Sequence, residues 1–436
     1  MKTEEGLVRA VGVRGLTAGM VNYMIGAGIF VLPAVVAVRV GAAAPVIYII
    51  CAVAMAMIVL CFADAGSRVS LSGGTYAYAE VAFGPYVGFI VATSLWFGST
   101  VLASAAVANV FMDTLSEIAP VMGQPVIRGV VLVLVYALFA FINIRGVKVG
   151  SRAVQTVTLA KLTPLLILVA FGLFALNARN LAWPGMPAGS EVARTTVMLL
   201  FAFLGIESAL TPSGEVRDPA RTVPRAIFSA LVLVTLLYMA IQVVAQGILG
   251  PALATESAPL TAAARRIAVP FGVLIGIGAV ISTFGHQSGM MLATPRVLFA
   301  FGRDGVLPSA FARVHPRFRT PHVAIITQAL VCALLAITSS FAGLAVLATV
   351  STLALYLVCC IAAWILRRRD VRAENGIPFR IPGGALVPVL AVAVIVWLLS
   401  SATAREFLVV GAVLAAAAVL YVVSGAHRAR RGARAA

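Results

Sequence analysis

The stretch Ile25-Gly26-Ala27-Gly28-Ile29-Phe30 lies in the middle of a run from Gly15 to Val38 that contains no charged residue. A run of this length can cross a bilayer as a helix, which takes about 20 residues. Glycine within a membrane helix lets the backbone unwind and approach a ligand. Unwound backbone at membrane depth is tolerated only where it is buried in protein or lines a cavity. The stretch therefore predicts a broken helix beside a binding cavity.

A second break of the same kind follows later in the chain. Phe203-Leu204-Gly205-Ile206-Glu207 lies within an apolar stretch that begins at Thr195. Glycines also allow tight helix packing in membranes, so either break alone is weak evidence. Two interrupted segments at matching places in two halves of a chain indicate the binding site of a transporter.

The composition excludes a soluble globular domain. Of the 436 residues, 61% are hydrophobic and only 11% are charged, whereas a soluble protein has about 25% charged residues. The stretch from Thr320 to Leu366 has no Asp, Glu, Lys or Arg and is too long for one helix, so we divide it at Ser339–Gly343. We predict an all-helical integral membrane protein with about twelve transmembrane segments: 15–38, 40–63, 85–112, 126–144, 153–176, 195–212, 226–249, 270–295, 322–338, 343–366, 384–402 and 406–425.

The net charge of +17 is distributed as a membrane topology signal. If both termini face the cytoplasm, 25 of the 32 Lys and Arg residues fall on the inner side. Cytoplasmic loops carry such an excess of positive charge. We therefore expect a multi-pass protein of the cytoplasmic (inner) membrane with both termini inside. Its basic loops would contact anionic lipid headgroups, and we expect no nucleic-acid partner.

Several other features bound the function. The first apolar run is too long for a cleavable signal peptide. The five cysteines lie in apolar runs without metal-ligand spacing, so we interpret them as small buried hydrophobic residues. We expect no metal and no cofactor. The outer connection Gly250–Pro270 has helical character over Pro259–Ile267, which suits a lid.

The first and sixth segments, which carry the breaks, are five segments apart, as an inverted five-plus-five repeat predicts. The predicted organisation is listed by residue range: 1–14, cytoplasmic tail; 15–366, ten-helix transport core; 367–383, cytoplasmic loop; 384–425, helices 11 and 12; 426–436, basic cytoplasmic tail.

Three ionisable residues lie away from the ends of the segments. Because charge within a membrane is costly, each is expected to have a functional or structural role. Glu207 either contacts a substrate ammonium or binds a proton, or it accepts hydrogen bonds from backbone N–H groups of the break. Lys161 either binds and releases a proton during a transport cycle or extends toward the cytoplasm. His286 has either a substrate or proton role or a structural, hydrogen-bonded one.

The two breaks suit a zwitterion. Free N–H groups at a half-helix that begins near Gly28 favour a carboxylate. Free carbonyl groups near Phe201, Ala202 and Leu204 would accept hydrogen bonds from an ammonium.

The chain resembles the amino acid-polyamine-organocation superfamily of secondary transporters from about Gly15 to Arg319 by motif, and beyond that by segment count. Four pieces carry the resemblance: Asn22-Tyr23-Met24-Ile25-Gly26-Ala27-Gly28-Ile29-Phe30-Val31-Leu32-Pro33; Ser72-Gly73-Gly74-Thr75-Tyr76 with Ala79-Glu80 and Phe83-Gly84-Pro85; Phe201 to Glu207 with Gly214-Glu215-Val216-Arg217-Asp218-Pro219 and Val223-Pro224-Arg225-Ala226; and Ala293-Thr294-Pro295-Arg296 with Gly302-Arg303-Asp304-Gly305-Val306-Leu307-Pro308.

The resemblance implies a leucine-transporter-type fold with helices 1 and 6 broken and two extra C-terminal helices. It implies that Lys161 matches the lysine of proton-coupled members, near Ser282 and Thr283, where related proteins bind a sodium ion. It also implies that Glu207 is a gating or proton-responsive group. The other implied site residues are a carboxylate-binding turn, Ile25, Gly26, Ala27 and Gly28, and an ammonium-binding turn, Phe201, Ala202, Leu204 and Gly205, with Phe201 as an aromatic gate.

Two positions depart from the family pattern. Ala27 stands where many members have Ser or Thr, so contact there would use the backbone alone. His286-Gln287 is unusual for this part of helix 8 and is a candidate for tuning substrate choice, as is Phe203.

We therefore expect an amino acid permease that works by alternating access, with proton symport as the preferred coupling. The alternatives are an exchanger of amino acids, or of amino acids and polyamines, and more remotely an intramembrane enzyme or a channel. Because the spans contain no nucleophile–base pair, no enzymatic activity is expected. Phe201 and Phe203 favour a neutral or apolar substrate. The sequence leaves the particular amino acid and the oligomeric state open.

Overall fold

The computed structural model describes residues 11–69, 74–145, 151–183, 185–207, 216–372 and 378–425. Within these ranges the chain is helical apart from its connections and one isolated bridge between Val11 and Val216. The α-helices are α1 (Val13–Met24), α2 (Gly28–Val40), α3 (Ala44–Arg68), α4 (Thr75–Phe83), α5 (Pro85–Ser94), α6 (Ala103–Ile118), α7 (Pro125–Arg145), α8 (Ser151–Gly172), α9 (Gly189–Leu200), α10 (Pro219–Leu249), α11 (Pro259–Ile267), α12 (Val269–Ala293), α13 (Pro295–Arg303), α14 (His322–Thr338), α15 (Phe341–Arg368), α16 (Leu386–Leu399) and α17 (Ala404–Val423).

Parts of the predicted organisation lie outside the described residues. These are residues 1–10 of the N-terminal tail, 208–215 after the second break, 373–377 of the loop after α15 and the basic tail 426–436. The motif residues Ser72, Gly73, Gly214 and Glu215 belong to the same group. The domain boundaries stay a prediction.

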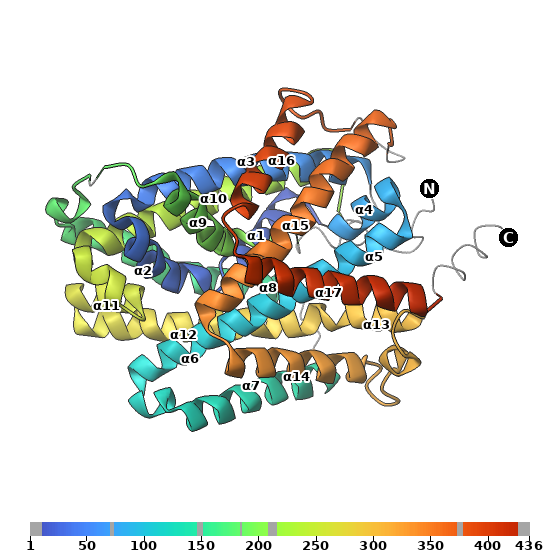
Figure 1. Ribbon diagram of the computed structural model, residues 1–436. Coiled ribbons are helices and arrows are strands. Elements are labelled where there is room, and N and C mark those ends of the chain that lie inside the picture. Colours follow the sequence, from blue (N-terminus) through green and yellow to red (C-terminus); the bar gives the residue numbers. More distant parts are fainter. Residues whose placement is uncertain are drawn as a thin grey trace.

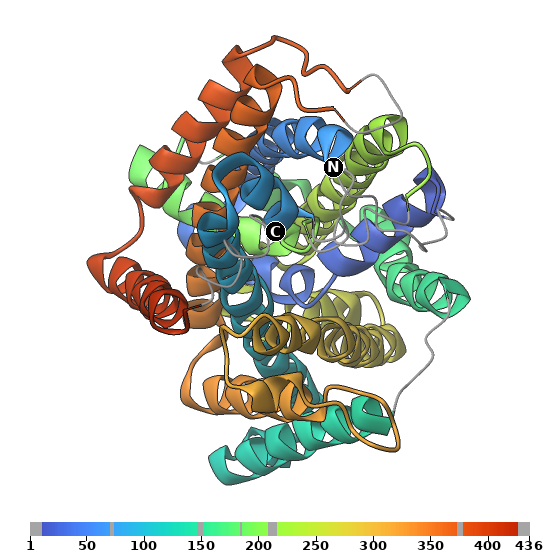
Figure 2. The same cartoon turned by 90° about the vertical axis from the view of Figure 1, so that its right-hand side faces the viewer.

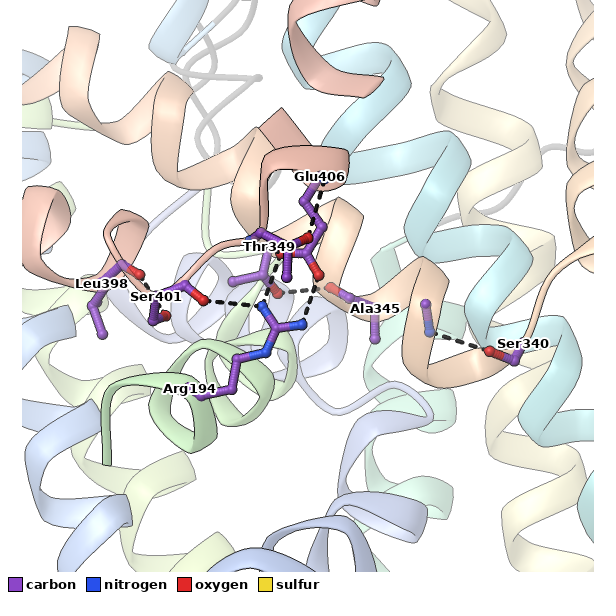
Figure 3. Close-up of polar contacts among 9 residues, drawn as sticks. Arg194, Ser340, Ala345, Thr349, Leu398, Ser401 and Glu406 are labelled. Carbon is purple, nitrogen blue, oxygen red and sulfur yellow. Dashed lines mark hydrogen bonds and ion pairs between the residues drawn. The ribbon is translucent and has the colours of Figure 1, made fainter. Parts of the chain in front are cut away.

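The structure is that of a multi-pass membrane protein. In the described part of the chain, seven helical stretches are long and apolar enough to cross a bilayer, and α14, α16 and the stretch Lys161–Ala175 are shorter apolar helices. The predicted division near Ser339 is confirmed, because α14 ends at Thr338 and α15 begins at Phe341. The Ser340 hydroxyl accepts a hydrogen bond from the Gly343 N–H at 3.3 Å and so caps α15 (Figure 3). The total of twelve crossings and the inverted repeat stay predictions.

Two helical stretches lie at the centre of the bundle, and two helices lie at its rim. In the most apolar part of Pro85–Ile118, 83% of the residues are buried, and in α15 72% are buried. The corresponding shares are 22% for α7 and 17% for α17. The end-on view of Figure 2 shows α7 and α17 at the periphery. Their exposed faces are apolar, as lipid contact requires.

The short helices mark the two ends of the bundle. Helix α11 lies at one end, whereas α4 and α13 lie at the other (Figure 1). The predicted helix over Pro259–Ile267 is confirmed, because α11 has these bounds.

The third segment is not one regular helix. A π-helix, η2 (Leu95–Leu102), separates α5 from α6. Its Gly98 packs against Ser351 of α15 so closely that any side chain at this position would overlap with the Ser351 hydroxyl. Such π-helical stretches occur frequently at functional sites. The stretch carries Ser99 toward the helix breaks.

Candidate functional site at two helix breaks

The first break lies between α1 and α2. Ile25 has φ −79° and ψ 78°, which is not helical, and the N–H groups of Ile25 and Gly26 bond back to Val21 and Met24, both at 2.9 Å. Helix α2 begins at Gly28, as expected for the half-helix after the first break, so the break covers Ile25–Ala27. At the start of α2 the Phe30 N–H donates to the Ala27 carbonyl at 3.0 Å, whereas the N–H groups of Gly28 and Ile29 have no partner within the helix. They present the positive end of its dipole to the break.

The second break follows α9. Phe201–Phe203 form one 3-10 turn, and Leu204 then becomes extended with ψ 151°. Gly205 has φ +105°, and a Cβ atom on this residue would lie 3.0 Å from the carbonyl oxygen of Tyr23. Both the backbone conformation and the space therefore require glycine at this position.

The two breaks lie against each other. A Cβ atom on Gly28 would lie 3.1 Å from the Cα of Ala202. The hydroxyl of Tyr238, on α10, lies 2.8 Å from the Met24 carbonyl oxygen and 3.1 Å from that of Ala202. A phenol has one proton, so it donates to one of these carbonyls at a time. Tyr238 thereby links the end of α1 to the turn that follows α9.

Glu207 is completely buried and fully hydrogen-bonded. One carboxylate oxygen accepts hydrogen bonds from the Gly205 N–H at 3.0 Å and from the Tyr356 hydroxyl at 2.6 Å. The other accepts a short hydrogen bond from Ser99. The carboxylate therefore ties the second break to η2 and α15. This arrangement supports the structural interpretation of Glu207 over direct substrate contact.

A small cavity lies between the breaks. It has about 20 Å³ of space for the centres of water-sized molecules, which holds about one water. An amino acid would fit only if side chains around the cavity moved apart. The lining residues are Tyr23, Met24, Gly26, Ala27, Gly28, Ser99, Ala103, Val107, Phe201, Leu204, Gly205, His286 and Met290.

The structure brings many of the predicted site residues to this cavity. The predicted residues that line it are Gly26, Ala27, Gly28, Phe201, Leu204, Gly205 and His286. The ring of Phe201 also packs edge-on against Phe341, with centroids 5.5 Å apart. Predicted residues that do not line the cavity are Ile25, Lys161, Ala202, Phe203, Glu207, Ser282 and Thr283.

Phe203 lies away from the cavity. Its side chain is fully buried and packs edge-on against the ring of Tyr238, with centroids 5.5 Å apart. The carbonyl oxygens of Phe201 and Ala202, expected to be free, accept hydrogen bonds from the Leu204 N–H and the Tyr238 hydroxyl. Each carbonyl keeps a second lone pair.

Lys161 is buried in α8, which packs against α1, α10 and α12. Its side chain is 2% exposed, and its ammonium has no hydrogen-bond partner among the described residues. The hydroxyl of Ser282 is likewise buried without a partner in this part of the chain, whereas Thr283 bonds the Ala279 carbonyl at 2.8 Å.

Sequence reasoning missed the residues that hold the breaks in place, namely Tyr238, Ser99 and Tyr356. Each is a single hydroxyl group in a long apolar segment, and nothing in the local pattern shows which way it faces. The one available signal was Gly98-Ser99-Thr100, a small polar group within the third segment. Among the described residues, no group of three or more His, Cys, Asp or Glu residues is placed to hold a metal ion.

Comparisons with known proteins identify the family of the chain. The sequence profile of the amino acid permease family matches residues 11–424. Three Bacillus subtilis (strain 168) proteins are similar along most of their length. They are a methylthioribose transporter (29% identity; 91% of this chain, 89% of the relative), the branched-chain amino acid permease BcaP (26%; 89%, 87%) and the serine/threonine exchanger SteT (28%; 90%, 91%).

These descriptions indicate a transporter and not an enzyme. The family profile covers nearly all of the chain, including both helix breaks and the helices that hold them. The chain therefore belongs to the amino acid permease family.

Proposed function

We propose that this protein is a secondary active transporter that moves an amino acid across the cytoplasmic membrane by alternating access, in symport with protons. It would cross the membrane twelve times with both termini in the cytoplasm. The first ten transmembrane segments, in residues 15–366, would form the inverted repeat. Helices α16 and α17 would follow as two additional segments. Its partners would be the amino acid, protons and membrane lipids.

The observation that carries this proposal is the meeting of two broken helices at one cavity, joined by Tyr238. The start of α2 offers N–H groups to a carboxylate. The turn that follows α9 offers carbonyl oxygens to an ammonium. Because both ends of an amino acid would be held by backbone from different helices, opening the cavity requires those helices to separate. Binding and conformational change would thus be linked.

Lys161 is the proposed proton carrier. A buried ammonium without a hydrogen-bond partner is unfavourable, so the residue can gain by releasing its proton. The neighbouring helix α12 provides Ser282, whose hydroxyl also lacks a partner in the described part of the chain. Ser282 and Thr283 would contact the lysine when it is protonated. Glu207 would hold the second break closed and would act on gating through Ser99 and Tyr356.

Exchange of amino acids is the second candidate. One relative is named a serine/threonine exchanger and aligns with 90% of this chain. In an exchanger Lys161 would keep its proton and act as a fixed cation. Transport would then need substrate on both sides of the membrane.

The decisive experiment is uptake of a panel of labelled amino acids by purified protein in liposomes, with and without an inward proton gradient. Accumulation driven by the gradient supports symport, and uptake only into preloaded liposomes supports exchange. Lys161→Ala should lose accumulation. Lys161→Arg keeps a cation that does not release its proton, so it should retain exchange while losing accumulation. Undiminished gradient-driven uptake in both variants would refute the lysine mechanism.

A further inference from the structure

His286 lies directly against the first helix break. It is on α12, its side chain is 8% exposed, and it lines the cavity. A Cβ atom on Gly26 would lie 3.2 Å from both the Cε1 and the Nδ1 of the ring. The imidazole therefore packs on the backbone of Gly26, beside the N–H groups at the start of α2.

No hydrogen bond of the His286 imidazole is found in the described part of the chain, and its nitrogens are not among the fully enclosed atoms that lack a partner there. The adjacent Gln287 shows the contrast. Its amide donates to the Ser104 carbonyl at 2.6 Å and to the Tyr136 hydroxyl at 3.1 Å, and it accepts from the Ser104 hydroxyl at 2.7 Å. Buried polar groups are normally paired. A polar ring that lines a cavity and has no hydrogen-bond partner in the protein is placed to form a hydrogen bond with a ligand.

The charges around the cavity indicate the sign of that group. No acidic residue lines the cavity, and both oxygens of the nearby Glu207 are occupied. Lys161 lies on α8, which packs against α12, the helix that carries His286. The start of α2 adds the positive end of a helix dipole at the same place. An imidazole carries at least one N–H whether it is neutral or protonated, so His286 can always donate.

We propose that His286 donates a hydrogen bond to the substrate carboxylate and forms the side-chain wall of a subsite whose other wall is the backbone turn Ile25–Gly28. The proposal rests on the proposed transport function. It also narrows the substrate to amino acids with a neutral side chain, because no other charged residue in the described part of the chain lines the cavity and, apart from Tyr23 and Ser99, the rest of the wall is apolar. Met24, Ala103, Val107 and Met290 form that part of the wall. Cationic side chains and substrates that lack a carboxylate are disfavoured.

The test measures competition in proteoliposomes. L-alanine, L-serine, L-valine and L-methionine, together with the carboxamide of each, compete against uptake of the best labelled amino acid. His286→Ala removes the donor, and His286→Gln restores an N–H of similar reach. Met290→Ala is the matched control, because Met290 lies one turn further along α12 and lines the same cavity. Size-exclusion profiles and melting temperatures establish that each variant is folded.

We expect the wild type to prefer each amino acid over its carboxamide by more than about 100-fold. In His286→Ala, affinity for the amino acids should fall about 10- to 100-fold, as loss of a hydrogen bond to a charged group predicts. Affinity for the carboxamides should change less. His286→Gln should recover part of the loss, and Met290→Ala should alter the choice among side chains but not the preference for a carboxylate.

Two results would overturn the assignment of His286. One is amino acid affinity in His286→Ala within about threefold of the wild type. The other is an equal loss for acids and carboxamides without recovery in His286→Gln, which would mean a structural role. Failure of the wild type to transport any amino acid would instead refute the proposed function. Competition by uncharged methylthioribose as strong as that of amino acids would refute the substrate class.

Discussion

The hydroxyl of Tyr356 lies 2.6 Å from a carboxylate oxygen of Glu207, and this contact joins the central helix α15 to the second helix break. The same carboxylate accepts the N–H of Gly205 and the hydroxyl of Ser99. Three donors from three parts of the chain thus meet at one buried anion. The break is held in shape by one contact of its own, from the Gly205 N–H, and by two hydroxyl groups from other parts of the bundle.

Replacing Glu207 should therefore damage the fold as well as transport. Glu207→Ala leaves three buried donors without an acceptor, which should reduce the free energy of unfolding by about 2–4 kcal/mol. Glu207→Gln keeps one acceptor oxygen and should cost less. Thermal and denaturant unfolding in detergent would measure both variants. Glu191→Ala, at an exposed carboxylate, is the control. Equal stability of Glu207→Ala and the wild type would contradict the locking role.

The hydroxyl of Tyr238 is expected to affect transport more than stability. Tyr238→Phe keeps the ring and its packing on Phe203 but removes the link between the Met24 and Ala202 carbonyls. We expect about a 10-fold rise in the KM for uptake and a stability loss of about 1 kcal/mol. Tyr136→Phe is the matched control, because that phenol is buried in a network with Ser104 and Gln287. Similar KM values for both variants would argue against a role for the link.

Gly205 should tolerate no side chain, and a comparison with Gly305 separates the two causes. Both residues have positive φ, +105° and +73°. An alanine at either position pays the cost of a left-handed backbone, about 1–2 kcal/mol. Only at Gly205 would the Cβ also lie within 3.1 Å of the Tyr23 backbone, because open space surrounds Gly305. We therefore expect Gly205→Ala to abolish uptake and Gly305→Ala to retain it. Uptake is compared between preparations in which both variants are folded to the same extent.

The ion pair between Arg194 and Glu406 should anchor α17 to α9. Two guanidinium nitrogens contact the carboxylate at 2.6 and 2.8 Å, and one also lies 3.4 Å from the Ser401 carbonyl oxygen (Figure 3). Both side chains are largely buried, with 21% and 14% exposure. A bidentate pair in this setting is stronger than an exposed one.

A double-mutant cycle with Arg194→Gln and Glu406→Gln should give a coupling energy of about 1–2 kcal/mol in unfolding experiments. The pair Arg39–Glu191, which joins α2 to the same helix α9, is the control. It is 33% and 46% exposed and should couple by less than about 0.5 kcal/mol. Indistinguishable couplings for the two pairs would show that α17 is held by apolar packing alone.

The amino-acid sequence was enough to predict an all-helical membrane fold and the place of the candidate site. Long apolar runs leave only helices as membrane-spanning structure, because each backbone group must be paired within its own segment. The glycines at residues 26, 28 and 205 marked where that pairing is interrupted. The same local logic predicted the end of α14 before Ser339 and the helix α11. These features depend on residues near one another in the chain.

Tertiary structure alone decided how the breaks are held and what faces the cavity. Tyr238, Ser99 and Tyr356 come from three different segments, and their contacts depend on how each helix is rotated in the bundle. A helix with apolar residues on all sides carries no pattern that fixes this rotation. For the same reason the sequence analysis named Phe203 as a candidate for tuning substrate choice, whereas the structure packs it against Tyr238. The rotation of each helix about its own axis is set by its packing against other helices. The sequence of a single segment does not show these contacts.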